Sequence, residues 1–200
     1  MGLDNYLYQE GFAYRLLPLK YTPGPDDQPK ADMVNSDVMY LNMMEKFRWA
    51  GMKTLNYMDP ETRRMNLSII NQFNTLAQAL YDKGENEKAR KALLKCIDVV
   101  PDINFSINFT LRKLYMADLL YKLKETEKAN TLVSNTADYL ENELLYHAAL
   151  KKDNGTVSMN DVQLGAYVSA ELAKLTAFNN QDRLSMKVQS QYERIIREFE

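Results

Sequence analysis

Apolar residues recur at intervals of three and four positions in two adjacent stretches near the middle of the chain. The first stripe consists of Phe73, Leu76, Ala77 and Leu80. The second stripe consists of Ala89, Leu93, Cys96, Ile97 and Val100. This spacing places each stripe on one face of a helix, so the pattern predicts two short helices that pack against each other. Gly84 lies between them, where a left-handed residue commonly ends a helix, and Pro101 closes the pair.

These residues resemble the tetratricopeptide repeat, a helical hairpin of about 34 residues. In that family small residues let the two helix backbones approach closely, and Ala77 and Ala89 fill those positions here. A second copy follows, in which Ala117 and Ala129 take the same places at an offset of 129 − 89 = 40 residues. This copy is less regular, because Lys124 stands where the first copy has a glycine.

The predicted fold is therefore all-α, a tetratricopeptide-like helical repeat that winds into an α-α superhelix. Its clear repeats cover about residues 70–101 and 110–141. Residues 1–30 form a separate opening part, an apolar lead-in followed by a linker that contains three prolines. Residues 31–200 form the helical-repeat domain.

Two helices are expected between the linker and the first repeat. One begins at Asn35 or Ser36, both good N-caps, and runs to about Trp49. Its predicted apolar face consists of Val38, Leu41, Met44 and Phe47. The many methionines around it indicate core filling rather than an adaptable peptide-binding surface. The other helix begins at Asp59, which is followed by a proline suited to the first turn, and leads into the first repeat.

A third helix pair is expected after the second repeat, whose last helix should extend toward His147. Residues 151–156 break the helical pattern, and Ser158 or Asn160 can cap the next helix. Its apolar side consists of Val162, Gly165, Val168, Leu172 and Leu175. After a second break at 179–182, the final helix is apolar on one side and charged on the other, as a terminal cap of a helical stack should be.

The opening part carries a further resemblance. The stretches concerned are 8–18 (YQEGFAYRLLP), 37–40 (DVMY) and 47–49 (FRW). They resemble the tail of a bacterial family of multi-spanning membrane proteins of unknown function, whose N-terminal half is similar to protein O-mannosyltransferases. The resemblance covers nearly the whole chain and implies that it is the soluble C-terminal tail of an inner-membrane protein, on the periplasmic side. Any glycosyl transfer would then take place outside these residues, and no catalytic residue is carried over.

The balance of charges gives no support to a nucleic-acid or an anionic-lipid partner. With 25 basic and 27 acidic residues the formal net charge is −2, so nothing attracts the chain generally to nucleic acid or anionic lipid. No apolar run approaches the ~18 residues of a membrane span, and the N-terminus lacks the features of a signal peptide. We therefore expect membrane contact only through a parent chain. A protein that begins at Met1 would instead be soluble and cytoplasmic.

Residues suited to catalysis or metal binding are sparse. His147 is the only histidine and Glu143 lies one helical turn before it, which makes an acid–base pair or half a metal site. Two ligands are too few for a metal, and Asp26 and Asp27 lack the spaced oxygen ligands of a calcium loop. Cys96 is the only cysteine, which excludes an intramolecular disulfide. We expect no enzymatic activity, cofactor or metal site in this chain.

A protein or peptide partner has more support. Stacked helix pairs leave a concave surface lined by the first helix of each pair, and this surface commonly receives a peptide. In the first repeat, four polar residues lie off the predicted packing stripe, namely Asn71, Asn74, Gln78 and Asp82. They form either a candidate binding groove or an ordinary solvated face.

Three functional hypotheses follow. The first is a non-catalytic protein-interaction or assembly domain of a glycosyltransferase-like membrane protein. The second is a free-standing soluble adaptor that binds peptides. The third, an enzyme with its site at Glu143 and His147, is the least favoured.

Overall fold

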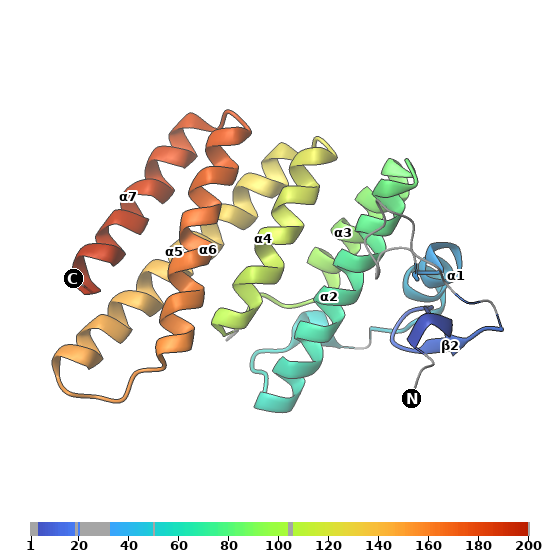
Figure 1. The fold of residues 1–200 in the computed structure, drawn as a ribbon, viewed down its shortest axis with the longest axis horizontal. Helices are drawn as coiled ribbons and strands as arrows, with labels where there is room; N and C mark the ends of the chain where they lie inside the picture. Colours follow the sequence, from blue (N-terminus) through green and yellow to red (C-terminus); the bar gives the residue numbers. More distant parts are fainter. Residues whose placement is uncertain (1–3, 19, 21–32, 50, 104–105, 200) are drawn as a thin grey trace. The chain divides into compact units, whose positions relative to one another are not determined.

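The computed structural model describes residues 4–18, 20, 33–49, 51–103 and 106–199. Over these residues it contains seven α-helices and one two-stranded sheet (Figure 1). The prediction of an all-α fold is confirmed at this level. The chain divides into two compact units, Met1–Asn104 and Phe105–Glu200, which are described in turn.

The first unit is built around a helical hairpin of α2 (Pro60–Asp82) and α3 (Asn86–Val99). All four predicted stripe residues of α2 are buried. On α3 the buried stripe includes Ala89, Leu93 and Cys96. The assignment of Ile97 and Val100 to this stripe is wrong, because Ile97 is 40% exposed and Val100 follows the last helical residue. Val99 is buried in their place, since the stripe advances by three residues from Cys96.

The turn between α2 and α3 has the left-handed residue predicted at Gly84, whose φ is +79°. The same conformation occurs at Lys124 (φ 63°) and Asn180 (φ 56°), at the turns between α4 and α5 and between α6 and α7. At each turn the left-handed residue donates to the carbonyl three residues before it, at 2.8, 2.9 and 3.0 Å. The next N–H donates to the carbonyl five residues back, at 2.8, 2.9 and 2.9 Å, which completes a Schellman motif.

Helix α2 begins as the sequence predicts. The Asp59 carboxylate accepts hydrogen bonds from the backbone N–H groups of Glu61 and Thr62 at 2.9 and 3.1 Å. Pro60 occupies the first turn, where its missing N–H costs nothing. Because Pro60 has no N–H, three N–H groups remain free at this helix start, and these bonds satisfy two of them.

This cap makes the stability of the first unit depend on pH. Hydrogen bonds, first that of the Thr62 side chain, hold the pKa of Asp59 below its usual value. A carboxyl whose pKa is lowered on folding stabilises the protein above its unfolded pKa, and the contribution is lost as the pH falls through the folded pKa. We expect Asp59→Ala to melt at a lower temperature than the wild type at neutral pH, with the gap closing below about pH 4.

Thermal unfolding followed by circular dichroism at several pH values measures this gap. Asp59→Asn is the matched control, because its side-chain oxygen still caps the helix and it carries no charge that titrates. A gap between wild type and Asp59→Ala that does not shrink at all as the pH falls below about 4 would contradict the assignment.

The helix predicted from Asn35 to Trp49 is shorter and irregular. Asn35 is the N-cap, but α1 spans only Ser36–Leu41 and continues as a π-helical turn, η2 (Asn42–Lys46). The predicted apolar face is also wrong, since Leu41 is 38% exposed while the buried residues are Ser36, Met39 and Met43. The flexible methionine side chains fill the interior at these positions, and Met39, Met43 and Met58 have no exposed surface.

The opening part contains a small β-hairpin that the sequence pattern did not indicate. After η1 (Asp4–Tyr6), β1 (Leu7–Gln9) pairs antiparallel with β2 (Tyr14–Leu16). The hairpin joins the first unit through β1, because the Gln9 N–H donates to the Met33 carbonyl at 2.8 Å. A short 3₁₀ turn, η3 (Met52–Thr54), precedes α2. The linker predicted at 21–30 lies outside the described residues.

The second unit consists of two helical hairpins. The first pairs α4 (Ile107–Lys122) with α5 (Thr126–Lys152), and the second pairs α6 (Met159–Phe178) with α7 (Asp182–Phe199). Helix α4 packs against α6 and α5 packs against both α6 and α7, so the two hairpins stack (Figure 1). The predicted extension of α5 beyond its usual end is confirmed, and Ser158 is the cap of α6.

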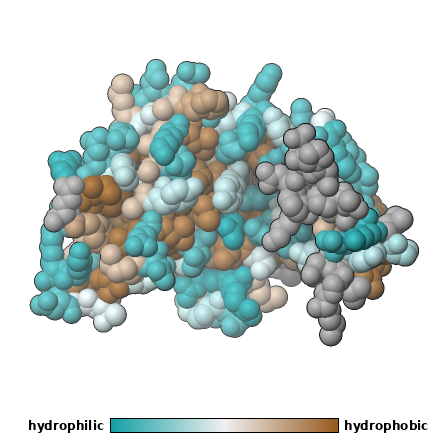
Figure 2. Space-filling model, viewed as in Figure 1, coloured by the Kyte–Doolittle hydropathy of each residue, from teal (hydrophilic) through white to brown (hydrophobic). Residues whose placement is uncertain are grey.

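Helices α5 and α6 approach each other closely at Gly165. Gly165 is buried there, and a Cβ built on it would lie 2.9 Å from Cδ2 of Leu144. Only glycine fits at this distance without a shift of the leucine. On α7 the buried residues are Val188, Gln191 and Ile195, and the exposed residues are polar except for Met186. On the face seen in Figure 2, hydrophilic residues lie around and between the exposed hydrophobic ones.

Candidate functional site

The four polar residues predicted as a groove on α2 do not share one environment. Asn71 and Asp82 are exposed, and Gln78 is partly buried. Asn74 is only 8% exposed, because it lies one turn after buried Ile70 and three residues before the buried Ala of the stripe. The Gln78 amide donates to the Asp82 carboxylate at 2.7 Å, so those two side chains are already engaged with each other. Asn74 therefore contributes little to an open surface on α2.

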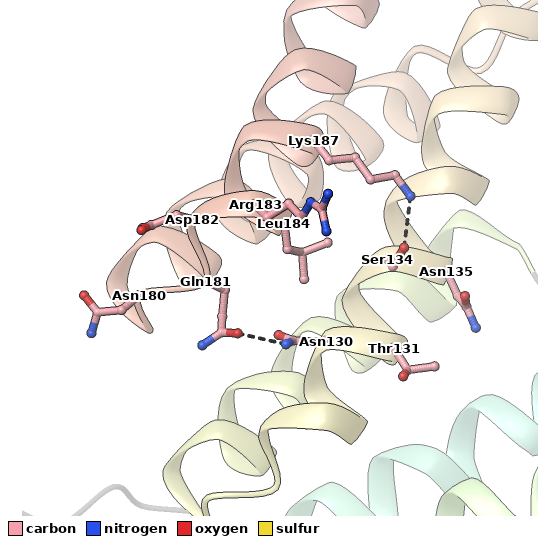
Figure 3. A pocket seen from close by; sticks show the side chains of 10 residues that line it. All are labelled: Asn130, Thr131, Ser134, Asn135, Asn180, Gln181, Asp182, Arg183, Leu184 and Lys187. Atoms are coloured by element: carbon pink, nitrogen blue, oxygen red, sulfur yellow. Dashed lines mark hydrogen bonds between the residues drawn. The ribbon is translucent and has the colours of Figure 1, made fainter.

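A polar surface lies in the second unit, between the start of α5 and the start of α7 (Figure 3). We call it the α5–α7 groove. It encloses about 840 Å³ and is open to solvent. Its lining residues are Asn130, Thr131, Ser134, Asn135, Asn180, Gln181, Asp182, Arg183, Leu184 and Lys187.

A chain of hydrogen bonds fixes one end of the α5–α7 groove. The Tyr121 hydroxyl donates to Asn130 Oδ1 at 2.6 Å, and Asn130 Nδ2 donates to Gln181 Oε1 at 2.8 Å. Gln181 Nε2 in turn donates to the Asn179 carbonyl at 2.8 Å. Burial raises the pKa of Tyr121 to about 12, so its hydroxyl stays protonated and remains a donor at neutral pH. This chain joins the two helical hairpins of the second unit by side-chain amides.

Lys187 crosses the groove from α7 toward α5. Its Nζ donates to Ser134 Oγ at 3.0 Å (Figure 3). It also donates to the Asp138 carboxylate at 2.9 Å. Burial alone would raise the pKa of Asp138, but hydrogen bonds from Lys187 and Gln191 outweigh it and hold that pKa below its usual value. Asp138 is therefore ionised at neutral pH, and its charge neutralises Lys187.

Two side chains that line the groove, those of Asn135 and Arg183, make no hydrogen bond or ion pair with the other residues that the structure describes. Both side chains are exposed. An amide offers a donor and an acceptor, and a guanidinium offers five donors in a planar fork suited to a carboxylate. The arrangement is suited to binding a polar extended molecule.

His147 and Glu143 lie one turn apart on α5, as predicted, with His147 Nε2 at 3.7 Å from Glu143 Oε1. The described part of the chain holds no group of three or more His, Cys, Asp or Glu side chains that could bind a metal. Cys96 is buried, and burial raises the pKa of its thiol well above the usual range, so it stays protonated and unreactive. Asp26 and Asp27 lie outside the described residues.

Sequence reasoning missed the α5–α7 groove, although one signal was present. Asn130, Thr131, Ser134 and Asn135 recur at helical spacing, so α5 carries a stripe of small polar residues. Among the described helices none is long and apolar enough to cross a membrane. Comparisons with protein-family models, with curated proteins and with solved structures found no match.

Proposed function

We propose that this chain is a non-catalytic protein-interaction or assembly domain with tetratricopeptide-like hairpins. The support comes from local geometry. Each of the three helix pairs has the same Schellman turn, and a new helix begins two residues after Gly84, Lys124 and Asn180. Fully buried alanines such as Ala77 and Ala129 occupy the positions where that repeat requires small residues. Helical stacks of this kind wind into superhelices that present long binding surfaces to peptides and proteins.

The observation that carries the proposal is the α5–α7 groove. Hydrogen bonds already orient Asn130, Gln181 and Lys187 around the groove, so among these polar side chains mainly Asn135 and Arg183 have to be ordered when a partner binds. Asn135 can exchange two hydrogen bonds with the backbone of an extended peptide, and Arg183 can pair with an acidic side chain of that peptide. The ligand class is thus an extended peptide with at least one acidic residue. The α2 residues Asn71, Gln78 and Asp82 are the alternative contact surface.

A binding experiment with matched variants tests this assignment. A random peptide library displayed on phage is selected against the full chain, and the binding of the selected peptide is measured by fluorescence anisotropy. We expect the double variant Asn135→Ala and Arg183→Ala to bind that peptide at least about tenfold more weakly, because one hydrogen bond to a charged group contributes about 1.5–3 kcal/mol.

The matched control replaces Asn71 and Gln78 of α2 by alanine. If this control weakens binding and the Asn135 and Arg183 variant does not, the peptide binds at α2 and the groove assignment is wrong. If the library yields no peptide that binds saturably, the peptide-binding proposal fails as a whole.

We further propose that the domain is the soluble, periplasmic tail of a glycosyltransferase-like inner-membrane protein, and that its contact with the membrane runs through that parent. The resemblance of residues 8–18 to such a tail supports this origin. Reading the source gene upstream of Gly2 tests it. A frame that continues into several apolar spans of ~20 residues agrees with the proposal. A true start at Met1 favours the free-standing soluble adaptor, which would be cytoplasmic.

A further inference from the structure

On the outer edge of β2, backbone groups point away from β1 and have no backbone partner among the residues that the structure describes. In an antiparallel pair, residues alternate between those that bond to the neighbouring strand and those whose N–H and C=O point away from it. The Leu17 N–H donates to the Tyr6 carbonyl at 2.9 Å, and the Glu10 N–H donates to the Ala13 carbonyl at 3.0 Å. This register, with Gln9 opposite Tyr14, directs the N–H and C=O of Tyr14 and Leu16 outward.

On the opposite edge of the hairpin, the outward backbone groups of β1 do have a partner. Gln9 of β1 also points its backbone outward, and it bonds to both sides of Val34. Its N–H donates to the Met33 carbonyl at 2.8 Å, and its carbonyl accepts from the Asn35 N–H at 2.9 Å. Among the described residues no backbone group hydrogen-bonds to the outward N–H and C=O groups of β2, and all three residues of β2 are exposed.

We propose that the outer edge of β2 binds an extended peptide of a partner protein as a third strand of this sheet. Tyr14 and Leu16 supply two N–H donors and two carbonyl acceptors, which an extended backbone matches. Their side chains are large and apolar yet 62% and 56% exposed, and they project on the same face of the sheet. A third strand buries part of that apolar surface and hydrogen-bonds to the outward backbone groups of Tyr14 and Leu16.

The charge of Arg15 indicates which peptide fits the edge of β2. Arg15 lies between Tyr14 and Leu16 and projects on the other face of β2. Its Nε is 2.8 Å from a Glu10 carboxylate oxygen, while 62% of the Arg15 side chain is still exposed. The remaining guanidinium N–H groups can bind a second carboxylate. The peptide that fits has an acidic residue opposite Arg15 and apolar residues on either side of it.

The same charge disfavours a second copy of this chain as the occupant. In the antiparallel register that pairs Tyr14 of one copy with Leu16 of the other, the two Arg15 side chains lie opposite each other, and opposed like charges destabilise a strand pair. The register shifted by one pair toward the C-terminus places Pro18 in the ladder, where it has no N–H to donate.

Two synthetic peptides test the proposal: acetyl-Thr-Val-Glu-Val-Thr-amide and its counterpart with a central lysine. Each is added to the full chain at millimolar concentration, and hydrogen exchange of the Tyr14 and Leu16 amides is followed by NMR. We expect the Glu peptide to slow both amides at least about tenfold, and the Lys peptide to leave them nearly unchanged. In Arg15→Glu the preference should reverse, so that the Lys peptide gives the stronger protection.

Leu16→Pro removes one outward N–H without touching the bonds between β1 and β2, so it should abolish protection at Tyr14. Leu16→Ala is the matched control, because it keeps the N–H and loses only side-chain contact. If the Leu16→Pro hairpin does not form, the charge reversal in Arg15→Glu decides the question alone.

Three results would overturn the proposal. The first is no protection of Tyr14 and Leu16 by either peptide. The second is protection by the two peptides that does not depend on the charge of residue 15. The third is protection that appears without peptide and grows with protein concentration, which would show that a second copy occupies the edge. Asn135 and Arg183 belong to the second unit and β2 belongs to the first, so the Asn135→Ala and Arg183→Ala variant tests the α5–α7 groove separately from the β2 edge.

Discussion

Replacing Phe73 by alanine is expected to lower the free energy of unfolding by about 3–5 kcal/mol. Phe73 lies in the middle of α2, has no exposed surface, and packs with its ring centroid 5.3 Å from that of Trp49. Truncation removes a large apolar side chain and leaves a cavity that the helical hairpin cannot fully close. Trp49 is the only tryptophan, so urea unfolding followed by its fluorescence reports directly on this part of the core.

Phe178→Ala is the matched control for this prediction. It removes the same side chain from a position that is 86% exposed, so we expect a change within about 0.5 kcal/mol. If Phe73→Ala costs no more than Phe178→Ala, the apolar stripe of α2 is not part of the core, and the hairpin assignment for residues 70–101 fails.

The hairpin of α2 and α3 could be predicted because its signals are local. Asp59 caps through N–H groups two and three residues ahead, and Gly84 ends a helix by its own conformational freedom. The hairpin of α4 and α5 shows how far such signals reach. Lys124 has no special freedom, yet the order of apolar residues around it was enough to place the turn correctly.

Features that depend on distant contacts could not be predicted. The β-hairpin owes its place to the contact of Gln9 with Met33 and Asn35, and three-residue strands leave almost no periodic signal. The π-helical turn after α1 likewise has no local signature. The α5–α7 groove joins Asn130 to Gln181, two residues far apart in the sequence. The sequence pattern of one helix shows which of its faces is polar. It does not show which polar face of another helix packs opposite.

The second large effect is expected at the crossing of α5 and α6. Leu144 has no exposed surface, and its side chain lies against Gly165. Leu144→Ala should lower the free energy of unfolding by about 2–5 kcal/mol, through the lost burial and the cavity that remains. Met186→Ala is the matched control, since Met186 is 73% exposed on α7 and its truncation leaves no cavity. Thermal and urea unfolding followed by circular dichroism give both values.

The same contact predicts a coupling between Leu144 and Gly165. Gly165→Ala alone places a methyl group 2.9 Å from Leu144 Cδ2, so the clash should outweigh the gain of up to about 1 kcal/mol from a better helix former. In the Leu144→Ala background that clash is gone and the methyl group fills part of the cavity, so Gly165→Ala should stabilise. A double-mutant cycle should therefore give a coupling energy between about 0.5 and 3 kcal/mol. Additive effects would mean that α5 and α6 do not approach at Gly165.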